Sequence, residues 1–253
     1  MEVHKHPHHV THKKKWYEYL LEFLMIFFAV FLGFIAENIR EHSVEGRREK
    51  EYIISLVEDL KTDTAKFAEI ISFNESQVKG LDSLANYSFN IPYSDSAVQY
   101  MYYLQRKWGS FTNDMTFTKR TITQLQNAGG MHLIRNRIAA DSIVRYYEKV
   151  TEAENQIKVF VTNFQTPALQ SSYWIYNRSY YKGISRGNAN LLISGSKKLT
   201  LITKNIPVLI NYANQIQTSQ GVLSYYCSML TSAREYCIQL IKTLQKEYHL
   251  ENE

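Results

Sequence analysis

The side chains most able to do chemistry are crowded near the N-terminus, where five of the eight histidines fall between residues 4 and 12: His4, His6, His8, His9 and His12. Imidazoles bind Zn, Ni and Cu ions, so the tract is a candidate metal site. No cluster of cysteines or carboxylates at fixed spacing accompanies it, and such a site would bind weakly. The alternative is a basic tail that gains charge below about pH 6.5 and adheres to anionic lipid headgroups.

Carboxylates that could act as an acid and a base occur at Asp59 and Asp63, four residues apart on one face of an expected helix. On a charged helix such a pair is usually solvated. The sequence has no GxGxxG, GxxxxGK(S/T), HExxH, GxSxG or CxxC motif. Outside the tail, His42, His132 and His249 are far apart along the chain. We therefore expect no enzyme and no cofactor.

The two cysteines, Cys227 and Cys237, are ten residues apart on one expected helix. This spacing corresponds to about 15 Å of helical rise, which is too far for a disulfide within a straight helix. We expect two buried, small apolar side chains. An intermolecular disulfide between copies of the chain is the alternative.

The strongest structural signal in the sequence is a run of apolar residues between Glu22 and Glu37. It has no polar stripe, which argues against a helix lying in the plane of a membrane. A bilayer core needs about 20 residues, so the segment is extended to 16–39, with Trp16 and Tyr19 at one interface. No small-residue cleavage site follows it, and the sequence predicts an uncleaved transmembrane helix.

Five residues of this segment are expected to contact lipid or a partner helix: Trp16, Tyr19, Glu22, Gly33 and Glu37. Glu22 has two interpretations. It lies either at the headgroup level, near the lysines at 13–15, or inside the bilayer, protonated or paired with a cation of another helix.

The orientation of the segment follows from its flanks. Lysines and arginines are nearly balanced across it, but the lysines at 13–15 directly precede the apolar run, and acids are frequent after it. We expect a cytoplasmic tail at 1–15, the transmembrane helix at 16–39, a charged stalk helix at 40–51 and a helical extracytoplasmic domain at 52–253.

Within that domain, apolar residues recur every three or four positions, which predicts an all-α fold. The first helix is expected to run from residue 52 to about Glu75, with a break or kink at Lys79–Gly80. A second helix is expected to follow through Leu81 and Leu84, up to a loop at 90–92. Ser94 or Asp95 caps a helix at 97–108. Further helices are predicted at 116–127 and at 138–166, the latter ended or kinked by Pro167.

The clearest helix of the domain is predicted at 206–248, with Asn205 as its cap and a long apolar seam. A helix of this length needs a partner to cover the seam. The amphipathic helix that begins at residue 52 is the expected partner. The fold is therefore predicted to be a transmembrane helix continuing into an elongated antiparallel helical bundle. Self-association through the same seam is the alternative.

Two stretches, 49–60 and 124–147, contain a Leu-x-x-Asp-Leu-like segment and an Asn-Ala-Gly-Gly-Met-His-Leu-Ile-Arg-Asn motif followed by Tyr146-Tyr147. Together with the apolar helix, they resemble a family of bacterial single-pass membrane proteins with no established activity. The resemblance covers roughly residues 16–150. It implies a Gram-negative inner membrane and a periplasmic domain, and it lends no catalytic residues.

The glycine motif also has a physical interpretation. Gly129 and Gly130 supply a left-handed helix cap and a tight turn. Asn136 is placed to cap the following helix. We expect a structural corner; the alternative is an anion-binding corner that uses Arg135 and Arg137.

These features favour a non-catalytic accessory or scaffold subunit of an inner-membrane assembly, whose partners are the lipid bilayer and other membrane-protein subunits or copies of itself. No basic block with spaced aromatics indicates nucleic-acid binding. The alternative is a periplasmic ligand-sensing bundle that signals through a membrane partner. It would need a pocket among six aromatic residues: Tyr100, Tyr102, Trp108, Tyr173, Trp174 and Tyr176. A third hypothesis is metal handling by the histidine tract.

Overall fold

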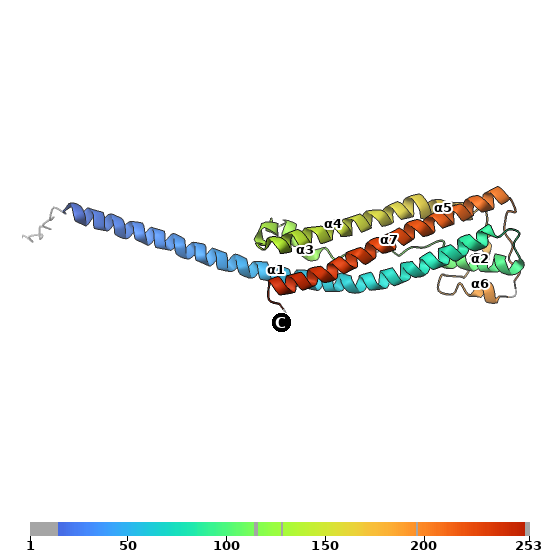
Figure 1. Cartoon of the computed structure of the whole chain (residues 1–253), viewed down its shortest axis with the longest axis horizontal. Helices are drawn as coiled ribbons and strands as arrows, with labels where there is room; N and C mark the ends of the chain where they lie inside the picture. Colours follow the sequence, from blue (N-terminus) through green and yellow to red (C-terminus); the bar gives the residue numbers. More distant parts are fainter. Residues whose placement is uncertain (1–14, 114–115, 128, 196, 251–253) are drawn as a thin grey trace, which may run out of the picture. The chain divides into compact units, whose positions relative to one another are not determined.

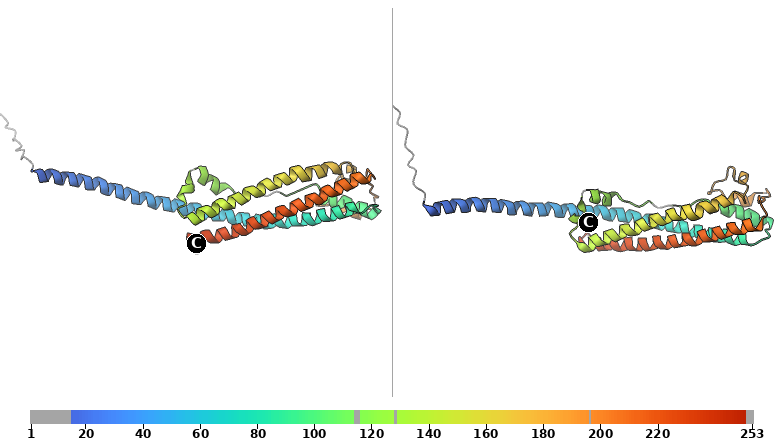
Figure 2. Two further views of the ribbon diagram at one scale, coloured as in Figure 1. Left: turned by 45° about the horizontal axis from the view of Figure 1, so that its top comes forward. Right: turned by 90° about the horizontal axis from the view of Figure 1, so that it is seen from above.

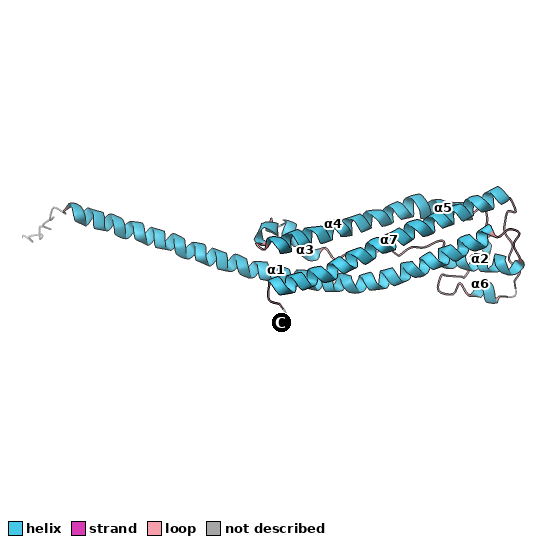
Figure 3. Cartoon of the chain, viewed as in Figure 1, coloured by secondary structure: helices cyan, strands magenta, loops and turns pink. Residues whose placement is uncertain are grey.

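The computed structural model describes residues 15–113, 116–127, 129–195 and 197–250. Over these residues the chain is helical and forms no strand; only an isolated antiparallel bridge joins Tyr176 and Leu201 (Figure 3). The predicted all-α class is confirmed. The chain divides into two compact units, Met1–Glu51 and Tyr52–Glu253, which we describe separately.

In the first unit, the described residues form the beginning of helix α1 (Trp16–Phe89). The expected apolar and charged segments are both helical, and the helix passes Gly46 without interruption. The open space around Gly46, with nothing within 4 Å of a Cβ placed there, means that no packing contact requires the glycine.

In the second unit, α1 buries one stripe of side chains: Ile53, Leu56, Leu60, Phe67, Leu84. The predicted break at Lys79–Gly80 is wrong, because α1 is helical through to Phe89. A Cβ at Gly80 would lie 2.1 Å from Cδ1 of Trp108. The glycine therefore makes room for the indole ring of Trp108, the residue that follows α2, and it does not end its own helix.

Helix α2 (Asp95–Lys107) begins at Ser94, whose side chain accepts a hydrogen bond from Ala97 N, as one of the two predicted caps requires. Helix α3 (Arg120–Asn127) begins four residues later than predicted. It is followed by a short 3₁₀ helix, η1 (Gly130–Leu133), and by α4 (Arg137–Phe160).

Pro167 does not end the helix that contains it. After α4 the chain makes one π-helical turn, η2 (Val161–Gln165), and continues into α5 (Thr166–Ser172), with Pro167 in its first turn. The first turn of a helix tolerates proline because its N–H groups lack helical partners there. The wider turn thus lets the chain stay helical where sequence rules predict an end or a kink.

Two short helices, η3 (Arg178–Tyr181) and α6 (Leu191–Ser194), precede the long α7 (Ile206–Glu247). Asn205 caps α7 by accepting from Val208 N, and the seam predicted for this helix is buried. α7 runs antiparallel to α4 and to the second part of α1 (Figures 1 and 2). It packs along α4, and Cys237 Sγ donates to the Leu60 carbonyl oxygen of α1 at 3.4 Å. The helix that the sequence predicted as the partner of α7, the second part of α1, is therefore one of its two neighbours, and α4 is the other.

Candidate functional site

Among residues 15–51, the described part of the first unit, nothing covers the apolar part of α1. The most apolar 18-residue window of the helix has a mean hydropathy of 2.4, and none of it is buried. Phe34 is 77% exposed and Ile26 is 67% exposed. The helix is long and apolar enough to cross a membrane.

The five residues expected to contact lipid or a partner all lie on this helix and are exposed: Trp16, Tyr19, Glu22, Gly33 and Glu37. Glu37 accepts a hydrogen bond from Arg40 Nε at 2.8 Å. The charge of the Glu37 carboxylate is therefore paired with a guanidinium of the same helix. A Cβ at Gly33 would meet nothing within 4 Å. The helix surface at Gly33 is thus open to a close neighbour.

In the second unit, Asp59 and Asp63 are 3% and 0% exposed, and the interpretation of a solvated face is wrong. Asp63 Oδ1 accepts from the backbone N and the Oγ1 of Thr118, at 2.9 and 2.7 Å. Its other oxygen accepts from the Tyr146 hydroxyl at 2.9 Å. Three donors from distant segments therefore converge on one carboxylate, which makes its burial tolerable.

Asp59 binds the first turn of α3. Its oxygens accept from Thr121 N at 3.0 Å and from the Arg120 guanidinium at 2.9 Å. Thr121 is in the first turn of α3, where N–H groups lack helical partners. The carboxylate on α1 thus caps α3, and residues 116–119 lie outside the helix because Asp63 holds Thr118.

The Tyr146 hydroxyl and the Cys237 thiol lie beside this carboxylate cluster. Burial, followed by the neighbouring Cys237 and Asp63, raises the pKa of Tyr146 far above its ordinary value. Burial also raises the pKa of Cys237, whose Sγ lies 3.4 Å from Thr64 Oγ1. Neither group supplies a nucleophile or a base at neutral pH. The cluster is a structural clasp between α1, α4 and the start of α3.

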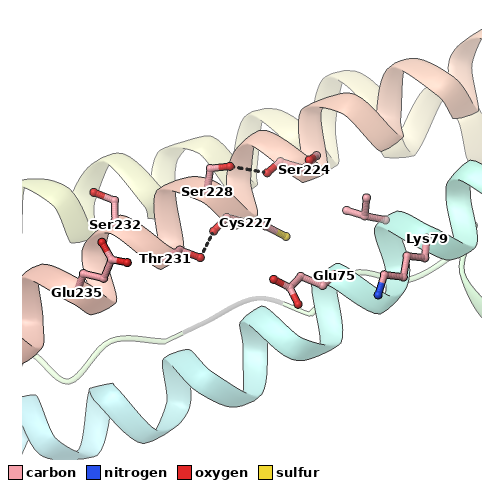
Figure 4. A pocket seen from close by; sticks show the side chains of 9 residues that line it. Glu75, Lys79, Ser224, Cys227, Ser228, Thr231, Ser232 and Glu235 are labelled. Carbon is pink, nitrogen blue, oxygen red and sulfur yellow. Dashed lines mark hydrogen bonds between the residues drawn. The ribbon is translucent and has the colours of Figure 1, made fainter.

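A groove of about 610 Å³ lies between α1 and α7, with Glu75 and Lys79 on one side and hydroxyl-bearing residues of α7 on the other (Figure 4). The hydroxyls of Ser228 and Thr231 donate to carbonyls four residues earlier in their own helix. Burial, with Glu75 as the second cause, raises the pKa of Cys227 to about 11. The Cys227 thiol is therefore protonated at neutral pH, and the Ser228 and Thr231 hydroxyls are engaged within their own helix.

The corner at residues 129–137 has the predicted structure. Gly129 has φ of +63°, in the left-handed region. Asn136 caps α4 by accepting from Ala139 N at 3.1 Å, and its Nδ2 donates to Glu247 of α7 at 2.6 Å. Arg137 lies 3.9 Å from Asp141 and is exposed. The first amides of α4 already have a side-chain acceptor, so the geometry supports a structural corner; Arg135 is exposed and has its own contacts.

The aromatic residues expected to line a ligand pocket instead pack against each other. Tyr102 and Tyr176 are fully buried, with ring centroids 5.0 Å apart. Trp108 borders a void of only about 10 Å³, and Trp174 is 73% exposed. Tyr102 and Tyr176 therefore belong to the core of the second unit, whereas Trp174 lies at its surface.

The proposed metal ligands His4, His6, His8, His9 and His12 lie outside the described residues. Across the parts of the chain that the structure does describe, no group of three or more metal-ligating side chains comes together. Comparison of the chain with protein-family models, curated proteins and solved structures finds no match. The functional argument therefore rests on the geometry given above.

Proposed function

We propose that this chain is a single-pass membrane protein that acts as a non-catalytic accessory or scaffold subunit of an inner-membrane assembly. The observation that carries the proposal is the complete exposure of the apolar stretch of α1. Leaving one large apolar side chain in water costs about 1.5–3 kcal/mol relative to burial, and a dozen of them are exposed together here.

A bilayer removes this cost at residues 16–39, which span about 36 Å of helix, enough for a hydrocarbon core of about 30 Å. The lysines next to the apolar run support a cytoplasmic N-terminus and a periplasmic helical bundle, and the family resemblance supports a bacterial inner membrane.

The non-catalytic role is supported by the use of the polar groups in the second unit. Asp59 and Asp63 hold α3 and the segment before it, and the two thiols have raised pKa values. The subunit role is supported by the open surface at Gly33, because small residues let membrane helices approach closely.

Purification in a mild detergent at native expression tests the proposal. We expect the chain to sediment with membranes and to elute as a complex larger than its 29.6 kDa mass. Gly33→Leu should release it from the complex, whereas Gly46→Leu, in the same helix but outside the apolar run, should not. A clean monomer contradicts the subunit role, and a chain that stays soluble without detergent contradicts the membrane anchor.

The second candidate is a ligand-sensing bundle that signals through a membrane partner. One observation favours it. The second unit has a cavity bordered by Ile91 and Lys204, which is not where the sequence predicted a pocket.

A further inference from the structure

A half-enclosed cavity of about 460 Å³ lies where the loop between α1 and α2 meets the segment leading into α7. Its volume is within the range of small-molecule pockets. Most of its wall is apolar: Ile91, Pro92, Val98, Leu199, Leu201, Ile206, Leu209. Val98, Leu199 and Leu209 are buried and form the floor, whereas Ile206 is 55% exposed and forms part of the rim.

The walls of the cavity are fixed by hydrogen bonds that do not point into it. The Tyr93 hydroxyl donates to the Ser88 carbonyl at 2.6 Å, and the Tyr102 hydroxyl donates to the Thr200 carbonyl at 2.8 Å. Ile202 N donates to the Ile175 carbonyl at 2.9 Å. The site is therefore formed before a ligand arrives, which lowers the entropic cost of binding.

The charge around the cavity is positive. Lys198 and Lys204 line it, together with one acid, Asp95, which lies 2.6 Å from Lys198. Among the described residues, no carboxylate lies within ion-pair distance of Lys204, so its ammonium can receive an anion.

Along the sequence, Lys198 and Lys204 belong to a stretch without acids. Residues 155–234 contain no Asp or Glu, while eight basic residues occur there: Lys158, Arg178, Lys182, Arg186, Lys197, Lys198, Lys204 and Arg234.

We propose that this cavity binds a small anionic amphiphile, with its alkyl or aryl part against Val98, Leu199 and Leu209 and its acidic head at Lys204. An apolar floor beside an uncompensated cation fits a carboxylate with a hydrocarbon tail. A neutral tail of the same length leaves the ammonium unpaired, and a cationic head is repelled. The proposal does not depend on the subunit role, because the cavity lies within the second unit alone.

The test compares decanoate with 1-decanol, which has the same chain length and an uncharged head. The full-length chain is reconstituted into phosphatidylcholine nanodiscs, and binding is measured by equilibrium dialysis, with empty nanodiscs subtracted. We expect saturable binding of decanoate about fivefold tighter than that of decanol, the factor of an exposed ion pair.

Two variants at the mouth of the cavity, each with a matched control, locate the site. Lys204→Gln should weaken decanoate binding about fivefold and leave decanol unchanged, whereas Lys242→Gln, an exposed lysine near the other end of α7, should change neither. Ile206→Ser should weaken both ligands about fivefold. Ile202→Ser, at an equally exposed isoleucine outside the lining, should weaken neither.

Three results would overturn the proposal: no binding above empty nanodiscs, equal affinity for decanol and decanoate, or the same decanoate affinity in Lys204→Gln and Lys242→Gln. All four substituted residues are exposed, so the variants are expected to fold, and the Tm of each checks this. A chain that binds decanoate but purifies as a monomer would contradict the subunit role and leave the site intact.

Discussion

The core of the second unit contains two polar regions of different chemistry. Buried carboxylates form the region around Asp63, and buried phenols form the region around Tyr102. Asp63 is fully buried and only accepts hydrogen bonds, from Thr118 and Tyr146. Tyr102 is equally buried, but its hydroxyl both donates, to the Thr200 carbonyl, and accepts, from Asn177 N.

The difference shows two ways to fix an irregular segment onto long helices. The Asp63 carboxylate gathers three donors, two from Thr118 and one from Tyr146, and each charged hydrogen bond is strong. A tyrosine ties two stretches together and fills the space between them with its ring. The carboxylate region therefore depends on charge, and the phenol region depends on packing and on remaining protonated.

Removal of the central carboxylate should have the largest effect. Asp63→Ala leaves the Thr118 and Tyr146 donors unpaired, and we expect a loss of about 3 kcal/mol in the free energy of unfolding. Asp82→Ala, at an exposed carboxylate on the same helix, should change it by less than about 0.5 kcal/mol. Urea denaturation followed by circular dichroism measures both. Equal effects would mean that the carboxylate cluster is not a structural clasp.

Removal of the central phenol should have a smaller effect. Tyr102→Phe keeps the ring and loses two hydrogen bonds, which should cost about 2 kcal/mol in the same measurement. Tyr225→Phe, at a hydroxyl on a side chain that is 59% exposed, is the control. If Tyr102→Phe costs as much as Asp63→Ala, the proposed distinction between charge and packing fails.

Two glycine substitutions sharpen the role of packing in the aromatic region. Gly221→Ala should stabilise α7 by about 1 kcal/mol, because nothing lies within 4 Å of the new Cβ and alanine favours a helix. Gly80→Ala should destabilise by about 1–2 kcal/mol despite the same helical gain, because its Cβ would collide with Trp108. Thermal denaturation gives the sign of each change. A stabilising Gly80→Ala would show that Trp108 moves aside freely.

Alkaline pH should have the smallest effect, and it should act on the buried phenols of both regions, because burial raises the pKa of Tyr146 as well as that of Tyr102. Burial raises the pKa of Tyr102 to about 12 from its ordinary value of 10. The folded chain therefore holds this proton more tightly than the unfolded chain. The stability it contributes is complete below pH 10 and is lost as the pH rises to about 12. The part of this loss that Tyr102 contributes should be on the order of 1 kcal/mol at pH 11.

Denaturation midpoints measured between pH 8 and 11.5 test this, with Tyr102→Phe as the control that should lose stability less steeply. A wild-type midpoint that stays constant to pH 11.5 would contradict the pKa shift.

The features that the sequence predicted correctly are those whose causes are local. Asn205 and Asn136 each cap the helix that begins at the next residue, and the seam of α7 repeats every three or four residues. The cap at Ser94 and the left-handed Gly129 follow the same logic. In each case the partner atom is within a few residues, so spacing alone is informative.

The errors concern residues whose partners are distant. Gly80 looked like a break because Trp108, which it accommodates, is 28 residues further along the chain, just after α2. Asp59 and Asp63 looked solvated because their donors come from 116–121 and 146. A signal was present, since Asp63 is on the same three-to-four-residue stripe as Leu56, Leu60 and Phe67. The cavity at Lys204 was missed because it joins loops far apart in sequence, although the acid-free stretch marked one side of it.

The two thiols of α7 are free and buried, with raised pKa values. Such thiols oxidise slowly, and the fold uses no disulfide whose formation would have to be catalysed. The second unit should therefore fold equally well in reducing and oxidising surroundings. Newly made chains would need no oxidoreductase in either surroundings, and the two buried thiols would resist oxidation.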